Sequence, residues 1–207
     1  MAKSLVTLDQ FKTYKSIKQS NTENDDKYNA LIKNVSEFIK NYCGKTFVDY
    51  YNVDKTELFD AVNVDEVFVD EQPIVSITSI EVSYDGGSTY STTLLVENTD
   101  FFADYDIGHI QSGSVATNFV FVTPGSSTIP QGVSKRSLRV IYKGGFSKVP
   151  MDIQQAALDL IEYYKEEEYT PRKEFSSFQL ENLGFRSGGT ADLPAHVKRV
   201  LDAYREL

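Results

Sequence analysis

The stretch DDKYNALIKNVSEFIKNYCG, residues 25–44, decides the fold because it predicts a long amphipathic helix. Its apolar residues recur at steps of three and four, which places them on one helical face: Tyr28, Leu31, Ile32, Val35, Phe38, Ile39 and Tyr42. Asn24 or Asp25 can cap the first turn, and Gly44 can adopt the left-handed conformation after the last turn. An apolar face this wide needs other helices to cover it.

The opposite face of this helix is polar, and the spacing predicts that it is exposed to solvent. Its residues are Asn29, Lys33, Asn34, Ser36, Glu37, Lys40 and Asn41. A shorter helix is expected to precede the long one, because Thr7 and Gln10 have the spacing of a capping box. We expect this first helix to extend to about Ile17.

Composition and charge limit the possible functions. The chain has 207 residues, a formal net charge of −9 and one cysteine, Cys43, so an internal disulfide is excluded. No apolar run reaches the length of a membrane span, and the N-terminus lacks the apolar core of a signal peptide, so we expect an intracellular protein. Residues 46–110 contain fourteen acids and a single base, Lys55, a formal charge of −13. Such a segment is typical of a solvated acidic face or of a surface that repels nucleic acid.

The middle of the chain, from Lys45 to about Phe146, is rich in β-branched and aromatic residues and predicts a small antiparallel sheet. Asp85-Gly86-Gly87 favours a hairpin turn between strands at 77–84 and 90–96. Two short strands are expected around 106–108, and SLRVIYKGG, residues 137–145, predicts a strand that ends at a glycine pair. Residues 123–132 have the composition of a loop.

Helical spacing returns after Pro150. At the acid run 166–168 the helix is expected either to fray, because acids oppose the dipole at a helix C-terminus, or to continue in some contexts. Residues 169–192 are predicted to form a long loop, and a last helix should follow Leu193-Pro194. The fold class is therefore α+β: a bundle of about four helices formed by both chain ends, with an inserted antiparallel β subdomain. The expected boundaries are 1–44, 45–146 and 147–207, within one compact domain.

No residues with a catalytic or metal-binding pattern stand out. His109 and His196 lack partners at metal-ligand spacing, and Cys43 is expected to be a buried structural thiol. Asp104 and Asp106 could form an acid pair, although an exposed strand explains them more simply. We therefore predict no catalytic residue, no metal and no cofactor. A binding module remains an alternative, with a carbohydrate or protein ligand on an aromatic sheet formed around Tyr84, Tyr90, Phe101, Phe102 and Tyr105.

Several segments resemble the head-to-tail connector (adaptor) family of tailed bacteriophages. They are VTLDQFKTYKSI, DDKYNALIKNVSEFIKNYCGKTF, QPIVSITSIEV, VPMDIQQAALDLIEYY and LPAHVKRVLDAYREL. The resemblance implies a structural virion protein and not an enzyme. It implies a ring, usually of twelve copies, that lies below the portal protein at the neck of a virion assembled in the host cytoplasm. The ring would extend the DNA channel without binding a specific DNA sequence, and would support the next neck or tail-completion protein; no membrane is involved.

The same resemblance suggests two sets of contact residues. Residues of the long loop are expected to touch the portal partner: Arg172, Lys173, Phe175, Phe178, Phe185 and Arg186. A ring subunit must also touch two neighbours, which makes part of the polar face of the long helix a candidate ring interface: Lys33, Glu37, Lys40 and Asn41.

Overall fold

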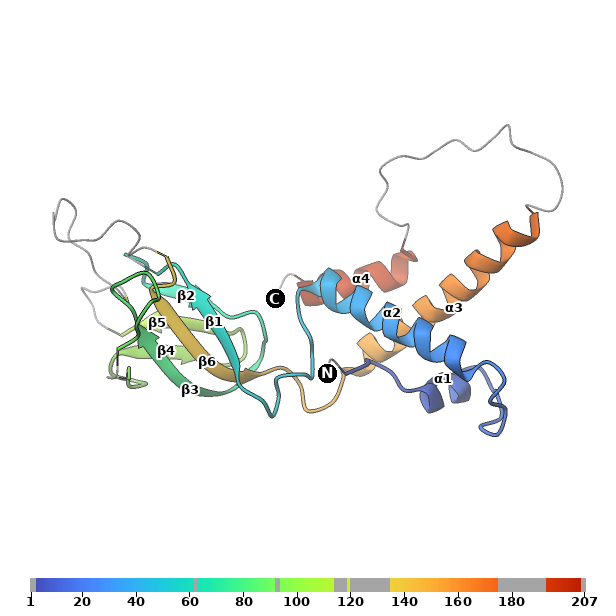
Figure 1. Cartoon of the computed structure of the whole chain (residues 1–207), viewed down its shortest axis with the longest axis horizontal. Helices are drawn as coiled ribbons and strands as arrows, with labels where there is room; N and C mark the ends of the chain where they lie inside the picture. The colour runs from blue at the N-terminus through green and yellow to red at the C-terminus, as the bar shows by residue number, and fades with distance from the viewer. Residues whose placement is uncertain are drawn as a thin grey trace, which may run out of the picture. The chain divides into compact units, whose positions relative to one another are not determined.

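The fold was analysed in a computed structural model, which describes residues 3–61, 63–91, 94–113, 119, 135–174 and 193–205. The chain divides into two compact units (Figure 1). One unit combines the two chain ends, Met1–Gly44 and Val149–Leu207, and the other is the middle of the chain, Lys45–Lys148. The α+β class predicted from the sequence is confirmed, with four helices and two small antiparallel sheets in the described part of the chain.

The helical unit contains α1 (Leu8–Tyr14), α2 (Asp25–Cys43), α3 (Met151–Glu174) and α4 (Ala195–Arg205). Helices α2, α3 and α4 all contact one another, and α1 packs on α2. The apolar faces predicted from the three-four spacing form the core of this unit, whose fully buried members include Phe11, Ile39, Ala157, Leu160, Ile161, Val197 and Leu201. Burial of these side chains is the main force that holds the helices together.

Local signals in the sequence explain where the helices begin and end. Thr7 and Gln10 form the predicted capping box, with Gln10 N–H donating to Thr7 Oγ1 at 3.2 Å and Thr7 N–H donating to Gln10 Oε1 at 2.7 Å. Gly44 ends α2 with a left-handed φ of 69°. Helix α1 ends at Tyr14, earlier than predicted, and Ser16 has a positive φ of 55°.

Helix α3 continues through the acid run 166–168 to Glu174, which corrects the predicted start of the long loop at residue 169. Residues 169–174 are therefore helical and do not belong to a loop. An unfavourable charge at a helix end costs only about 0.3–1 kcal/mol, and Glu and Lys are good helix formers. The acid run was therefore a weak reason to end the helix.

In the described residues, the β-rich unit contains two three-stranded antiparallel sheets, where the sequence predicted one. The first sheet has the order β1-β6-β3, formed by β1 (Lys55–Phe59), β6 (Leu138–Gly144) and β3 (Ile74–Val82) (Figure 1). The second has the order β2-β5-β4, formed by β2 (Glu66–Phe68), β5 (His109–Ser112) and β4 (Phe101–Asp104). Alternation predicts strands but does not say which strands pair, so the division into two sheets was not visible in the sequence.

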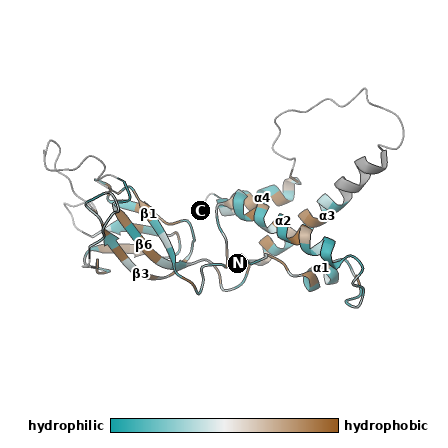
Figure 2. Ribbon diagram, viewed as in Figure 1, coloured by the Kyte–Doolittle hydropathy of each residue, from teal (hydrophilic) through white to brown (hydrophobic). Residues whose placement is uncertain are grey.

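The two sheets share one core. Strand β6 alternates buried and half-buried residues along its whole length, and its side chains Leu138, Val140 and Tyr142 are fully buried. Hydrophobic and hydrophilic stretches follow one another along the strands of the first sheet (Figure 2). They belong to the same buried cluster as Val67, Phe101 and Ile110 of the second sheet. The inner faces of both sheets therefore cover one core, and their outer faces point away from it.

The predicted hairpin around 85–87 is only partly formed. Its first strand is β3, but the described residues of 90–96 form no regular strand. Two hydrogen bonds still tie this segment to β3: Ser91 N–H donates to Val82 O at 2.8 Å, and Leu95 N–H donates to Ile80 O at 3.1 Å. The predicted strands around 106–108 are confirmed as β4 and β5.

The predicted loop at 123–132 lies outside the described residues. Among the residues that were described, no helix is long and apolar enough to cross a membrane.

Candidate functional site

The polar face of α2 was the predicted ring interface, and it is only partly exposed. Lys33 and Asn41 are exposed and Glu37 is half-buried. Lys40 is only 5% exposed, and its Nζ donates to the carbonyl of Lys3 at 2.7 Å. The expectation that Lys40 faces solvent is therefore wrong.

The N-terminal segment explains this difference, because it covers part of the face that helical spacing marks as polar. Leu5 and Val6 are buried, and Leu5 N–H donates to Ser36 Oγ at 3.0 Å. Ser36, also expected on the outer face, is consequently buried. Helical periodicity describes the helix alone and does not report a neighbouring segment that packs on its polar side.

The predicted portal contacts fall in two places. Arg172 and Lys173 lie in the C-terminal part of α3 and not in a loop. Phe175, Phe178, Phe185 and Arg186 lie outside the described residues.

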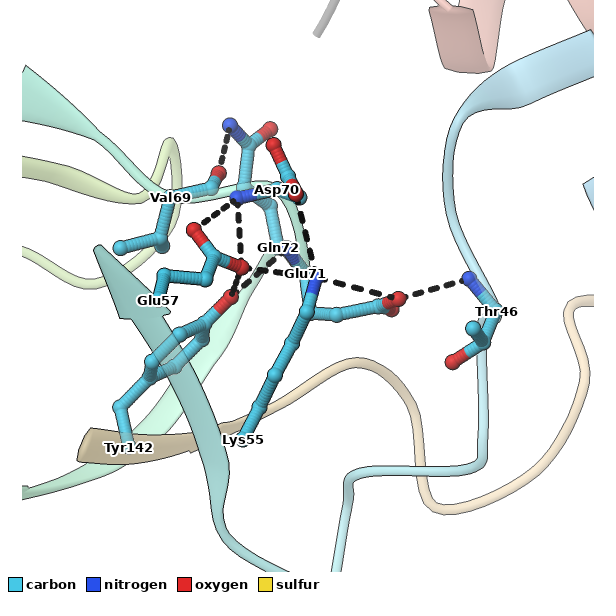
Figure 3. A network of polar contacts seen from close by, with 8 residues as sticks. All are labelled: Thr46, Lys55, Glu57, Val69, Asp70, Glu71, Gln72 and Tyr142. Carbon is cyan, nitrogen blue, oxygen red and sulfur yellow. Dashed lines mark hydrogen bonds and ion pairs between the residues drawn. The ribbon is translucent and has the colours of Figure 1, made fainter. Parts of the chain in front are cut away.

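A buried polar cluster lies on the core side of the first sheet, where the chain enters and leaves the β-rich unit (Figure 3). At its centre, Lys55 Nζ lies 2.7 Å from Glu57, 3.2 Å from Asp70 and 3.8 Å from Glu71. Burial lowers the pKa of Lys55, but the hydrogen bond to Glu57 and the three carboxylates outweigh it and leave the pKa raised. Lys55 therefore stays charged and neutralises acids that lie beside the core.

Tyr142 joins this cluster to the core. Its hydroxyl donates to Glu57 Oε1 at 2.6 Å and accepts from the N–H of Glu71 at 3.0 Å. Burial, followed by the adjacent Glu57 carboxylate, raises the pKa of Tyr142 far above its usual value, so the hydroxyl stays protonated. The buried hydroxyl therefore both donates and accepts a hydrogen bond, as a buried polar group requires.

The cluster holds the entering segment of the β-rich unit, and backbone hydrogen bonds beside it hold the returning segment. The N–H of Thr46 donates to Glu71 Oε1 at 2.8 Å (Figure 3). On the returning segment, the N–H of Gly145 donates to Pro73 O at 2.8 Å and that of Phe146 donates to Phe47 O at 2.6 Å. The arrangement is suited to anchoring the chain. The sequence signal for it is the isolated position of Lys55 among fourteen acids.

The outer face of the second sheet exposes aromatic and acidic side chains. Register places Glu66, Gln111 and Phe102 in one row, and Phe68, His109 and Asp104 in the next. Phe68 is 53% exposed and Phe102 is 49% exposed. The Phe68 ring stacks on His109 with centroids 4.7 Å apart, and His109 Nε2 lies 3.0 Å from Glu66 Oε2.

The outer face of the first sheet has a different character. Arg139 forms an ion pair with Glu81 and lies over the Tyr90 ring, 3.9 Å from its centroid. Lys143 is on the same face of β6, and the apolar residue Leu58 of β1, which pairs with Arg139 in the register, is 44% exposed. This face also carries acids, since Thr78 Oγ1 donates to Asp54 Oδ1 at 2.8 Å, so it mixes apolar, basic and acidic side chains.

The aromatic residues proposed for an alternative ligand site do not form one exposed surface. Phe101 is 3% exposed and belongs to the core, whereas Phe102 points outward. Tyr105 is half-buried and donates to Glu97 at 3.0 Å, and the Tyr90 hydroxyl donates to the carbonyl of Arg136 at 3.1 Å. Only Tyr84 and Phe102 of the five are exposed, so the predicted aromatic platform is wrong.

The remaining candidate residues have structural partners. Asp104 Oδ1 accepts from the N–H groups of Asp106 and Ile107 at 3.1 and 3.4 Å, which caps the turn between β4 and β5. The Cys43 thiol is buried and donates to the carbonyl of Leu201 at 3.6 Å. His196 is exposed and lies 3.3 Å from Asp159. Among the described residues, no group of His, Cys, Asp and Glu side chains could hold a metal ion.

Comparison with known proteins relates the whole chain to one family. A family model for head completion proteins matches residues 4–207. No match was found among the curated proteins.

Two solved structures share the fold. One is a chain in the neck of an empty gene transfer agent (GTA) particle, with a TM-score of 0.58 and 13% identity. The other is a chain in the virion of a native GTA particle, with a TM-score of 0.55 and 14% identity. Each match covers 97% of this chain and 89% of the chain compared.

Proposed function

Because the chain belongs to the head completion protein family, a family of structural virion proteins, we propose that it is a head-to-tail connector that forms a ring below the portal. The observation that carries this proposal is the match to that family along nearly the whole chain. The similarity in fold to a chain of a GTA neck supports it. In this role the ring lies in the neck of the particle, receives the portal on one side and supports the next neck or tail-completion protein on the other.

We propose twelve copies in the ring. The GTA neck with the similar fold was computed with C6 symmetry, and twelve is a multiple of six. Twelve identical subunits around one axis require two complementary contact surfaces on each copy.

The acidic β-rich unit suits a channel through which DNA moves. Residues 46–110 carry a formal charge of −13, and like charges keep the phosphate backbone from adhering. Because screening limits this repulsion to a Debye length of about 8 Å at physiological ionic strength, it would keep DNA off the wall without blocking passage.

The ring interface that we propose on α2 is reduced to Lys33, Glu37 and Asn41, since Lys40 is buried against the N-terminal segment. Charge reversal by Lys33→Glu should weaken ring formation. A solvated face would tolerate this change with little effect. The same reversal at Lys18, an exposed lysine outside α2, is the matched control.

The portal contacts that we propose lie in the C-terminal part of α3 and beyond it: Arg172, Lys173, Phe175, Phe178, Phe185 and Arg186. Limited proteolysis with and without portal tests this assignment. Protection of the segment 169–192 on addition of portal supports the contact, and unchanged cleavage contradicts it.

Mass measurement of the purified chain, alone and mixed with portal, tests the function itself. We expect a ring or a portal-dependent complex. A chain that stays monomeric and never binds portal would contradict the proposal. The mixture with portal is the decisive sample, because a connector can remain monomeric until it meets its platform.

A further inference from the structure

Strand β1 lies at one edge of the first sheet, whose order is β1-β6-β3. Successive residues of a strand direct their backbone N–H and C=O groups to opposite sides. Just before β6, the carbonyl of Ser137 accepts from the N–H of Ser83 at 2.8 Å, so Ser137 faces β3. Val140, an odd number of residues further along the strand, therefore faces β1, where it pairs with Glu57. Glu57 in turn faces β6.

Thr56 and Leu58, the two neighbours of Glu57, consequently direct their N–H and C=O groups away from β6, to the open edge of β1. Among the described residues, none forms a hydrogen bond with these four backbone groups. Backbone groups without a protein partner stay in contact with water in a native fold, and both residues are exposed. The edge of β1 is therefore open to solvent.

The other edge strands are covered in part or short. On β3, the carbonyls of Ile80 and Val82 accept from the segment 91–95. On β4, the carbonyl of Phe101 accepts from the N–H of Asn98 at 2.7 Å. Strand β2 has only three residues, whereas β1 has five. In the described part of the chain, β1 is therefore the longest edge without a backbone partner.

The open edge of β1 is complementary to an extended backbone. Two donors and two acceptors lie on one side of the strand at a spacing of two residues, which is the pattern that a neighbouring strand offers in return. A helix uses its own N–H and C=O groups internally and cannot match this pattern. Leu58 is 44% exposed on the outer face, so it can also contact an aliphatic side chain of an added strand.

A second copy of this chain does not fit the edge through its own β1. Antiparallel pairing of two β1 strands that uses both Thr56 and Leu58 would place Glu57 directly opposite Glu57 of the other copy. The same register would set Asp54 opposite Asp60 at both ends of the pair. Like charges directly opposite one another destabilise a strand pair, so the edge disfavours self-pairing.

We propose that the open edge of β1 binds an extended segment of another protein of the particle, which continues the first sheet beyond β1. The segment places an aliphatic or β-branched side chain beside Leu58. This inference rests on the proposed function, because it assigns to the neck protein a surface that receives one of its neighbours. Main-chain hydrogen bonds supply the contact, and Leu58 fixes its register.

Hydrogen exchange tests the contact on the unmodified chain. In the free chain, we expect the amides of Thr56 and Leu58 to exchange rapidly and those of Glu57 and Phe59 slowly, because only the latter pair with β6. In intact particles, the amides of Thr56 and Leu58 should become protected. A chain that is present in the particle but keeps these two amides in rapid exchange would overturn the inference. Absence of the chain from the neck would contradict the proposed function instead, so the two failures are distinguishable.

A proline at the edge provides a second test. Leu58→Pro removes a donor that faces solvent and leaves the hydrogen bonds between β1 and β6 in place, which is where a strand tolerates proline. Leu58→Ala is the matched control, since it removes the side chain and keeps the N–H. With the fold retained in circular dichroism, incorporation of Leu58→Pro into particles should fall several-fold below that of Leu58→Ala. Equal incorporation of the two folded variants would overturn the inference, and the exchange measurement decides if Leu58→Pro does not fold.

Cross-linking identifies the occupant. Thr56→Cys places a thiol at the edge, and the natural Cys43 is only 4% exposed, so the unmodified chain gives a low background. The variant is labelled with a benzophenone maleimide, assembled into particles and irradiated. We expect a covalent product with a different protein, identified by mass spectrometry. A dimer of this chain, or no product from particles that contain the labelled variant, would overturn the proposed occupant.

Discussion

Removal of the charge at Lys55 should destabilise the β-rich unit strongly. The Lys55→Met substitution keeps a similar length and leaves Glu57 and Glu71 without their counter-charge. The side chains of these two acids are only 10% and 2% exposed. Removal of one partner from a buried ion pair costs about 3–5 kcal/mol, whereas the mostly exposed Asp70 should contribute little. We therefore expect the free energy of unfolding to fall by about 3 kcal/mol.

Urea unfolding followed by far-UV circular dichroism and by tyrosine fluorescence measures this change, since the chain has no tryptophan. Lys135→Met is the matched control, because Lys135 is an exposed lysine of the same unit, and we expect it to change stability by less than about 0.5 kcal/mol. The double variant Lys55→Met, Glu57→Gln should be more stable than Lys55→Met alone. The amide that replaces the Glu57 carboxylate can still accept a hydrogen bond from the Tyr142 hydroxyl, and the substitution removes one buried negative charge. A loss below about 0.5 kcal/mol for Lys55→Met, or strictly additive effects in the double variant, would refute the assigned role of this cluster.

Three further changes probe local features of the fold. Gly145→Ala should reduce the yield of folded protein, because φ is 91° and a Cβ atom would lie 2.4 Å from the carbonyl oxygen of Phe47; a soluble variant of unchanged stability would contradict this. Thr7→Ala should lower stability by about 1 kcal/mol in thermal unfolding, through loss of the N-cap of α1, and Thr7→Ser should not. Burial and the Asp152 carboxylate raise the pKa of Tyr204 to about 12. Tyr204 therefore contributes stability that is complete below pH 10 and decreases toward pH 12, so Tyr204→Phe should flatten this part of the stability–pH profile, and an unchanged profile would contradict the contact.

Much of the fold could be predicted because its signals are local. Three-four spacing and Gly44 predicted α2, and two-residue alternation predicted β6. The resemblance to the phage connector family is confirmed by the family match over residues 4–207. These signals depend on neighbours along the chain, which the sequence displays directly.

The predictions that failed depend on contacts between distant segments. Lys40 and Ser36 were placed in solvent because the segment around Leu5 lies outside the helix that defines their periodicity. Phe101 and Phe102 were both assigned to a ligand surface, although adjacent strand residues point to opposite faces and only Phe102 is exposed. The division of the strands into two sheets likewise follows from long-range pairing that alternation does not encode.

The structure also changes the meaning of the acidic segment. Its formal charge of −13 suggested a uniform repulsive surface, but several acids are already engaged within the unit. Glu57 and Glu71 surround Lys55, and Glu81 pairs with Arg139.

Asp85 keeps its charge and is held in its own turn, where hydrogen bonds from Thr89 and Ser83 lower its pKa to about 2. Acids that are neutralised beside the core stabilise the fold and exert little force on DNA, whereas exposed acids such as Glu66 act at the surface. The repulsive charge of this unit is therefore smaller than the composition indicates and is concentrated where the chain is open to solvent. Substitutions that probe DNA passage should therefore be made at exposed acids such as Glu66, because changes at Glu57 or Glu71 would disturb the fold first.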